Sequence, residues 1–187
     1  YVRGQHQDYD HWRQLGNLGW GWDDVLPYFK KSEDYVHGAD DFHGAGGEWR
    51  VEEMRLRWEI LDAFREAAFE AGIPKIDDFN RGDNEGSSYF QVNQRRGVRW
   101  STAKGFLHPV RGRANLRVLT GAQASAIEFD GKRVTGLRFR RRGRDFVAGV
   151  KGELVLASGA IGSPQILQLS GVGPPELLAQ HGIETRH

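Results

Sequence analysis

The sequence contains no cysteine. The chain therefore forms no disulfide, and it offers neither a thiolate ligand for a metal nor a thiol nucleophile. No apolar run approaches the roughly 18 residues that a transmembrane helix needs. The first ten residues are polar and do not have the apolar core of a secretory signal. These absences exclude thiol chemistry and are compatible with a cytoplasmic protein.

An excess of either charge is also missing. Lys and Arg number 26 and Asp and Glu number 25, which gives a net charge of +1. Nucleic-acid-binding domains are usually clearly basic, so this composition speaks against that class. Five arginines lie within Arg138–Arg144. A phosphate-binding or nucleic-acid-binding patch is one interpretation of them, and we favour the other, a solvated strand face and hairpin.

The chain has 187 residues and does not begin with Met. That length is enough for one domain or for parts of two. The sequence starts as if a strand or turn were already under way, and it stops at "HGIETRH", where an apolar strand would be expected to follow. We interpret the chain as an internal piece of a longer protein. A processed or trimmed domain is the alternative.

Local patterns predict a mixed α and β structure. One helix is expected after a cap at Asp23 or Asp24, with Pro27 in its first turn. The clearest helix is Arg57–Ala71, by its apolar spacing, and a short one follows Ser101 or Thr102 and ends before Pro109. Strands are expected at residues 48–53, 89–93, 115–120, 124–129, 133–141, 145–150 and 153–157, with a hairpin turn at Asp130-Gly131.

The stretch "GAIGSPQILQLSGVG" at 159–173 raises the main question about function. It follows the apolar residues 153–157, which predict a buried strand. Ser163 then fits a helix N-cap with Pro164 at the first helical position. A small-residue turn before a helix N-terminus favours a negatively charged group such as a phosphate. The alternative is a structural turn without a ligand, and the chain contains no GxGxxG fingerprint.

Residues 159–173 match every position of the second signature of the glucose–methanol–choline (GMC) oxidoreductases, and the chain is identified as resembling that family. Other segments are similar to it as well, among them "YVRGQHQDYDHW", "WGWDDVLPYFKKSED", "DFHGAGGEWRV" and "RRGVRWSTAKGFLHPV". The likeness covers essentially the whole chain and is greatest for the bacterial choline-dehydrogenase-like branch.

The resemblance implies an FAD-dependent enzyme that oxidises an alcohol by hydride transfer to flavin. The fold class it implies is mixed α/β: part of an FAD-binding Rossmann-like domain, together with much of a substrate domain that has an antiparallel sheet. Residues 1–48 would be a lid or linker region with parts of the FAD domain, 49–112 a substrate-domain part, and 113–187 an FAD-domain part. By the same resemblance, the residues expected to contact FAD are Gln123, Ala124, Ala157, Ser158, Gly159, Ala160 and Ser163.

No catalytic residue is assigned within the chain, because the resemblance places the catalytic histidine beyond His187. The seven histidines are expected to be surface or loop residues and lack metal-ligand spacing; they are His6, His11, His37, His43, His108, His181 and His187. On the substrate side, strand residues could line a cavity or pack in a core, and both interpretations stay open; they are Tyr89, Phe90, Gln91 and Asn93.

The expected partners are an alcohol substrate and the remainder of the parent polypeptide, with no nucleic acid and no clear membrane segment. A bacterial cytoplasmic location is predicted, with peripheral attachment to a membrane as an alternative. Taken alone, the 187 residues are expected to be inactive. The rival to an enzyme is a non-enzymatic domain that binds a small ligand or nucleotide through the same turn.

Overall fold

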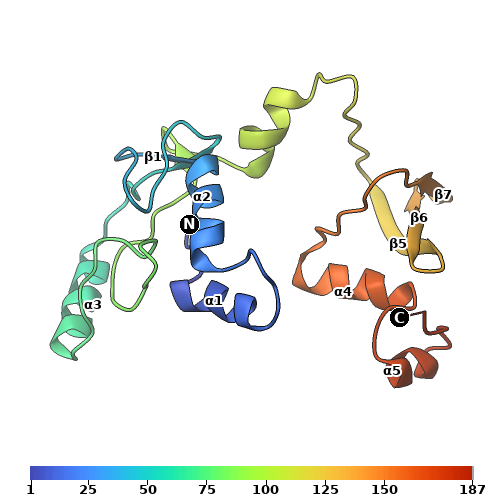
Figure 1. The fold of residues 1–187 in the computed structure, drawn as a ribbon. Coiled ribbons are helices and arrows are strands. Elements are labelled where there is room, and N and C mark those ends of the chain that lie inside the picture. Colours follow the sequence, from blue (N-terminus) through green and yellow to red (C-terminus); the bar gives the residue numbers. More distant parts are fainter. Residues whose placement is uncertain (187) are drawn as a thin grey trace. The chain divides into compact units, whose positions relative to one another are not determined.

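The computed structural model describes residues 1–186, and the chain divides into two compact units, Tyr1–Leu116 and Arg117–His187 (Figure 1). The prediction of a mixed helix and strand structure with an antiparallel sheet is confirmed. The domain boundaries expected from the sequence, after residues 48 and 112, stay predictions.

The first unit combines three α-helices with short strands. Helices α1 and α2 lead into the parallel pair β1 and β2, and α3 is followed by the small hairpin β3–β4. A π-helical turn and a 3-10 turn complete the unit. The bounds are α1 His6–Gln14, α2 Trp22–Ser32, β1 Glu33–Tyr35, β2 Trp49–Val51, α3 Glu59–Glu70, β3 Gln94–Arg95, β4 Val98–Arg99, π-helix Ala103–Leu107 and 3-10 helix His108–Val110.

Helix α2 begins earlier than the sequence suggests. Its N-cap is Gly21, and the Asp24 carboxylate accepts a hydrogen bond of 3.0 Å from the Gly21 N–H. Asp24 therefore caps the helix from inside its first turn, as a carboxylate at the third helical position does. Pro27 consequently lies within the helix, and its predicted place in the first turn is wrong. The helical turn after Ser101 is confirmed, but it continues through Pro109 instead of ending before it.

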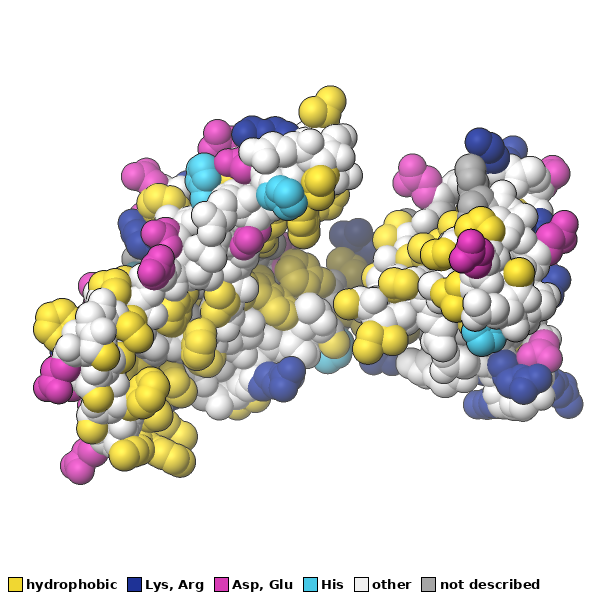
Figure 2. All heavy atoms as spheres, turned by 90° about the horizontal axis from the view of Figure 1, so that it is seen from below, with side chains coloured by type: hydrophobic (Ala, Val, Ile, Leu, Met, Phe, Trp, Pro, Cys, Tyr) yellow, Lys and Arg dark blue, Asp and Glu magenta, His cyan; other side chains and the backbone are white. Residues whose placement is uncertain are grey.

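Helix α3 confirms the helix predicted at Arg57–Ala71, yet none of its residues is buried. Phe64 is 72% and Ile60 69% exposed, and Trp58, the residue before the helix, is 62% exposed. The apolar spacing thus identified the helix correctly, but residues 1–186 do not cover its apolar side chains. Figure 2 shows hydrophobic side chains at the surface of each unit.

The second unit is an antiparallel meander with two helices. Strands β5, β6 and β7 form a three-stranded sheet, and α4 packs against β5. Its buried apolar side chains are Ile127 of β5, Ile166 of α4 and Leu178 of α5. The bounds are β5 Ala122–Asp130, β6 Arg133–Arg141, β7 Arg144–Gly149, α4 Gly159–Leu169 and α5 Pro175–Gln180. The predicted hairpin between β5 and β6 is present, and its two-residue loop is Gly131-Lys132.

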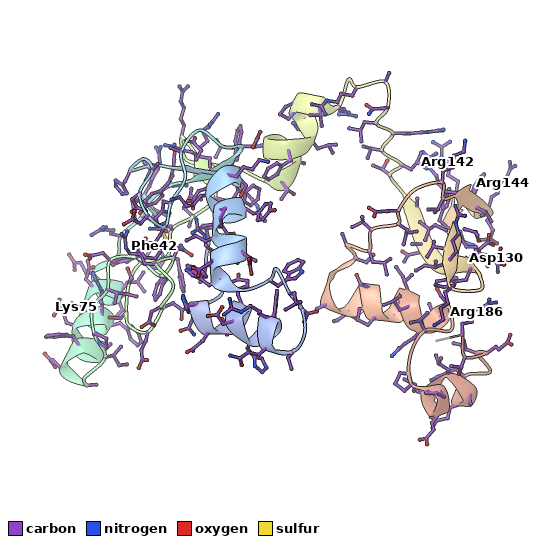
Figure 3. All side chains as sticks on the ribbon, viewed as in Figure 1. Phe42, Lys75, Asp130, Arg142, Arg144 and Arg186 are labelled. Atoms are coloured by element: carbon purple, nitrogen blue, oxygen red, sulfur yellow. The ribbon has the colours of Figure 1, made fainter. Side chains whose placement is uncertain are left out.

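The arginine-rich segment Arg138–Arg144 forms the end of the β6–β7 hairpin, as the solvated-face interpretation predicts. Arg142 and Arg144 extend from the turn (Figure 3). Arg140 makes two hydrogen bonds to the Asp145 carboxylate on the paired position of β7, at 2.9 and 3.1 Å. Exposed pairs of this kind contribute little to stability. The arginines here mainly give the hairpin a polar, solvent-exposed surface.

Three strand predictions are wrong. Residues 115–120 and 153–157 form no strand, and 89–93 contributes only the bridge of Val92 to Glu52. Val155 is 82% exposed. An apolar strand of the buried type needs a neighbouring strand and cover on its faces, and within residues 1–186 no strand pairs with 153–157. In the described part of the chain, no helix is long and apolar enough to cross a membrane.

Candidate functional site: an exposed turn and a buried ionic cluster

The turn that the sequence singles out lies at the start of α4. The helix begins at Gly159 with Ser158 as its N-cap, so the prediction that Ser163 caps it and Pro164 opens it is wrong. Ser163 acts from within the helix instead, because its Oγ accepts a hydrogen bond of 3.0 Å from the Ser158 N–H. Ser163 thus stabilises the turn, although it lies five residues after Ser158.

The backbone at Gly159 is suited to a ligand that comes close. Its φ is +82°, a value that residues with a Cβ adopt at a cost. Apart from its chain neighbours and the nearby backbone of its own helix, no atom of residues 1–186 lies within 4 Å of where a Cβ would stand. The residues Ala157 to Ala160 are exposed. The N–H groups of a first helical turn have no acceptor within the helix, and the helix dipole favours an anion there. This turn can therefore bind a phosphate group.

The other two residues predicted to contact the cofactor lie on β5. Gln123 is exposed and Ala124 half-buried, close to the first residue of the strand. The structure thus places the two predicted groups on two elements, β5 and α4, that pack against each other. Ser158 and Ser163 are joined directly by their hydrogen bond. The small side chains of residues 157–160 leave the backbone of the turn exposed.

The C-terminal end of α4 is closed by the Ser-Gly pair of the same signature. Gly171 has φ +87°, and a Cβ there would lie 2.5 Å from the carbonyl oxygen of Glu184. The N–H of Arg186 donates to the Gly171 carbonyl at 2.7 Å. Glycine is required at this position for two reasons, because the backbone is left-handed and because the chain after α5 packs directly on it.

The first unit contains a buried ionic cluster that the sequence did not reveal, formed by Arg3, Glu33, His43 and Asp78. His43 Nδ1 lies 3.0 Å from Glu33 Oε2, and its Nε2 lies 2.6 Å from Asp78 Oδ2. Arg3 donates to the same Glu33 oxygen at 2.7 Å. The side chains of Arg3, Glu33 and His43 are at most 1% exposed and that of Asp78 is 6% exposed.

The expectation that every histidine is a surface or loop residue is therefore wrong for His43, which is in a loop but fully buried. His6, His11, His37, His108 and His181 are exposed, as expected, and His187 lies outside the described residues. The partners of His43 are 10 and 35 residues away in sequence. A single sequence gives no spacing signal for such a pairing.

The opposite charges within the cluster stabilise the ionised forms of His43, Glu33 and Asp78. Burial alone would lower the pKa of His43, but its hydrogen bonds to Asp78 and Glu33 and their negative charges outweigh this and raise it to about 9. Burial alone would raise the pKa of both carboxyl groups. The pKa of Glu33 is nevertheless lowered by hydrogen bonds from His43 and the Gly44 N–H, and that of Asp78 by His43 and the Asn80 N–H.

It follows that His43 is an imidazolium at neutral pH with both N–H groups donated to carboxylates. A general base needs a free nitrogen within reach of the proton that it takes. His43 has none, so the cluster is structural. Tyr35 stacks on the imidazole with 3.9 Å between ring centroids and closes the cluster from one side.

The four residues expected on the substrate side differ in their burial and in their hydrogen-bond partners. Gln91 is buried, donating to the Tyr35 hydroxyl at 2.8 Å and accepting from Asn80 at 2.9 Å, so it extends the polar interior. Asn93 donates to the Arg50 carbonyl. Tyr89 donates to the Asp62 carboxylate at 2.6 Å. Phe90 is 54% exposed. The first two act as core or framework residues.

Comparison with known proteins connects this geometry to one family. A family model described as GMC oxidoreductase matches residues 1–182. The chain is 40% identical over 190 residues to an oxygen-dependent choline dehydrogenase of Pectobacterium atrosepticum, covering all of this chain and 34% of that protein.

Two solved structures are similar as well. A crystal structure of pyridoxine 4-oxidase from Mesorbium loti matches with a TM-score of 0.90 and 33% identity, over 99% of this chain and 37% of that one. An FAD-dependent oxidoreductase from Chaetomium thermophilum matches with a TM-score of 0.88 and 30% identity, over 99% of this chain and 34% of that one. The chain thus spans about a third of the length of these proteins.

Proposed function

Because the chain belongs to the GMC oxidoreductase family, we propose that it is part of an FAD-dependent enzyme that oxidises an alcohol to a carbonyl compound. The observation that carries this proposal is the turn before α4. It combines an exposed left-handed glycine with a helix N-terminus, inside the segment that fills the family's second signature. Flavin, when bound, supplies the acceptor for the hydride that leaves the alcohol carbon.

We propose that the turn holds the adenosine and diphosphate end of FAD. The backbone of Ala157, Ser158, Gly159 and Ala160 would face the phosphates. The Ser158 N–H is donated to Ser163 Oγ and holds the turn in shape, so the donors to the phosphates would be the N–H groups of the first helical turn. Gln123 and Ala124 of β5 would meet the adenosine. Backbone donors at a helix N-terminus suit the diphosphate because they are fixed in direction and need no side-chain charge.

The chain's own histidines are not proposed as the base that takes the alcohol proton. His43 has both nitrogens committed to carboxylates, and the other described histidines are exposed. The part of the reaction that we assign to these residues is therefore binding and orientation of the cofactor. The proton acceptor would come from elsewhere in the full-length protein.

The substrate is proposed only as a class, an alcohol. The names of the similar proteins point to choline in one case and pyridoxine in another. Both molecules carry a CH–OH group but are otherwise different, so the substrate is not narrowed further. The remaining proposals are that the rest of the parent polypeptide completes the site and that the enzyme is located in a bacterial cytoplasm.

The test is a visible absorption spectrum of the full-length gene product, purified without added cofactor. We expect flavin bands that bleach anaerobically when a substrate alcohol from a panel including choline and pyridoxine is added. A colourless protein that stays colourless after incubation with FAD would contradict the proposal. The rival, a non-enzymatic ligand-binding domain, would then be preferred.

A further inference from the structure

Ser170 has a buried hydroxyl with two short hydrogen bonds. The residue is 6% exposed and is the C-cap of α4. Its Oγ donates to the Ile166 carbonyl of the same helix at 2.5 Å and accepts the Ile127 N–H of β5 at 2.7 Å. The hydroxyl therefore uses its proton on the helix and a lone pair on the strand, and it joins α4 to β5 directly.

Of these two bonds, the one from the Ile127 N–H to Ser170 Oγ is a directional contact between β5 and α4, and the one to the Ile166 carbonyl fixes the hydroxyl on its own helix. The apolar contact there involves Ile127 and Ile166, both 6% exposed, and apolar packing fixes a separation better than it fixes a register. A buried N–H that loses its acceptor is costly. The helix therefore cannot slide or rotate along the strand without breaking the bond between Ile127 and Ser170.

Both elements carry residues proposed to contact FAD. Gln123 and Ala124 are the second and third residues of β5, and Gly159 is the first residue of α4. From Gly159 to Ser170 the helix is roughly 16 Å long at about 1.5 Å per residue. A rotation of a few degrees at Ser170 consequently moves the turn by about an ångström, which is enough to spoil hydrogen bonds to a phosphate.

We propose that Ser170 is a positioning residue for the adenosine end of the cofactor. It acts through α4 and β5 and does not touch FAD. This inference rests on the proposed function, because it needs the turn and β5 to bind the same cofactor. It assigns a reason to a serine that lies eleven residues after Gly159, the first glycine of the motif.

The alternative is that Ser170 only stabilises the unit. To separate the two, we compare Ser170→Ala with Ile166→Val in the full-length protein. Ile166→Val removes a buried methyl group from the same contact between helix and strand and leaves both hydrogen bonds intact. It therefore lowers stability without changing the register of α4 on β5.

A conservative variant tests for rescue. Ser170→Thr keeps the hydroxyl at a position that, with Ile127, Leu169 and Gly171, lines a groove of about 360 Å³. Ser170→Cys keeps the size but replaces the hydroxyl by a weak donor and acceptor. It serves in place of Ser170→Ala if the alanine variant does not fold.

The measurements are the dissociation constant of FAD from the apoprotein and the midpoint of thermal unfolding without FAD. We expect Ser170→Ala to raise the dissociation constant at least tenfold and Ser170→Cys several-fold, with Ser170→Thr within about threefold of the wild type. Ile166→Val should lower the midpoint and leave the dissociation constant unchanged.

Two results would overturn the inference while the proposed function stands: unchanged FAD affinity in the alanine or cysteine variant, or an equal loss of affinity in Ile166→Val. Wild-type protein that binds no FAD at all would be a failure of the proposed function itself, and it would remove the inference together with it.

Discussion

His43 and Asp78 are 35 residues apart in sequence, and their side chains meet in the interior of the first unit with 2.6 Å between Nε2 and Oδ2. The opposite ring nitrogen meets Glu33, which also accepts from Arg3. Two positive and two negative groups are thus buried together. A buried ion pair of this kind contributes little when compared with apolar residues of the same shape, but removing one partner is costly.

The first prediction concerns pH. The pKa of His43 is about 9 in the folded state against 6.5 in the unfolded state. Its contribution to stability is therefore complete below pH 6.5 and is lost as the pH rises through 9. The lowered pKa values of Glu33 and Asp78 have the opposite effect, with stability lost as the pH falls into the acid range. The thermal midpoint of the full-length protein should fall between pH 6 and pH 9.

The control for this effect is His43→Gln, which hydrogen-bonds but does not titrate. Its midpoint should be lower at pH 6 than that of the wild type, and the part of the decrease between pH 6 and 9 that belongs to His43 should disappear. An unchanged pH dependence in the glutamine variant would show that other groups cause it.

The second prediction concerns Arg3, whose guanidinium donates to Glu33 and to the Phe42 carbonyl at 2.7 and 2.6 Å. Arg3→Met leaves the buried Glu33 carboxylate short of a partner. We expect a loss of about 3–5 kcal/mol in the free energy of unfolding, measured by urea denaturation. The matched control is Arg140→Met, which breaks an exposed pair with Asp145 and should have little effect. Equal losses in the two variants would contradict the structural role of the cluster.

The third prediction concerns the end of α4. Gly171→Ala places a Cβ 2.5 Å from the Glu184 carbonyl on a left-handed backbone, so the chain after α5 must move. We expect a loss of roughly 2–4 kcal/mol, from overpacking and backbone strain together. In Gly112→Ala, where nothing lies within 4 Å and φ is not positive, the stability should be unchanged. A fully stable Gly171→Ala protein would argue against the geometry at this position.

The fourth prediction concerns the turn itself. Gly159→Val forces a β-branched residue to φ +82°, which costs of the order of 1–3 kcal/mol, and fills the space where the proposed phosphate contact lies. The flavin-to-protein ratio of the purified full-length variant should fall roughly tenfold or more. Gly152→Val, in the exposed connection before α4 and without positive φ, should retain its flavin. Normal flavin content in the Gly159 variant would remove the turn from the cofactor site.

The sequence predicted those elements whose signals are local. The hairpins of β5, β6 and β7 follow from alternation and turn residues over a few positions, and α3 follows from its spacing. The start of α4 was misplaced because Pro164 favoured the first helical position. The helix instead contains the proline in its interior, and Ser163, one residue before it, accepts a hydrogen bond from the N–H of the N-cap residue Ser158.

Features that depend on distant partners escaped prediction. Residues 153–157 have the composition of a buried strand, but composition does not say whether neighbouring strands are present. His43 looks like an ordinary loop residue until Glu33 and Asp78 are brought to it. The FAD contacts expected at Gln123 and at the turn of Gly159 came from family resemblance and remain predictions that the flavin measurements test.

The separations within the ionic cluster also bear on how the protein is made. The Arg3 backbone N–H donates to the side chain of Asn80, 77 residues later, and His43 pairs with Asp78, 35 residues later. A ribosome must therefore synthesise 35 residues beyond His43, just under a third of the first unit, before the cluster can close, and closing such long loops carries an entropic cost. Until then, the charged side chains of the nascent segment remain hydrated, and we therefore expect the cluster to form late in the folding of the unit.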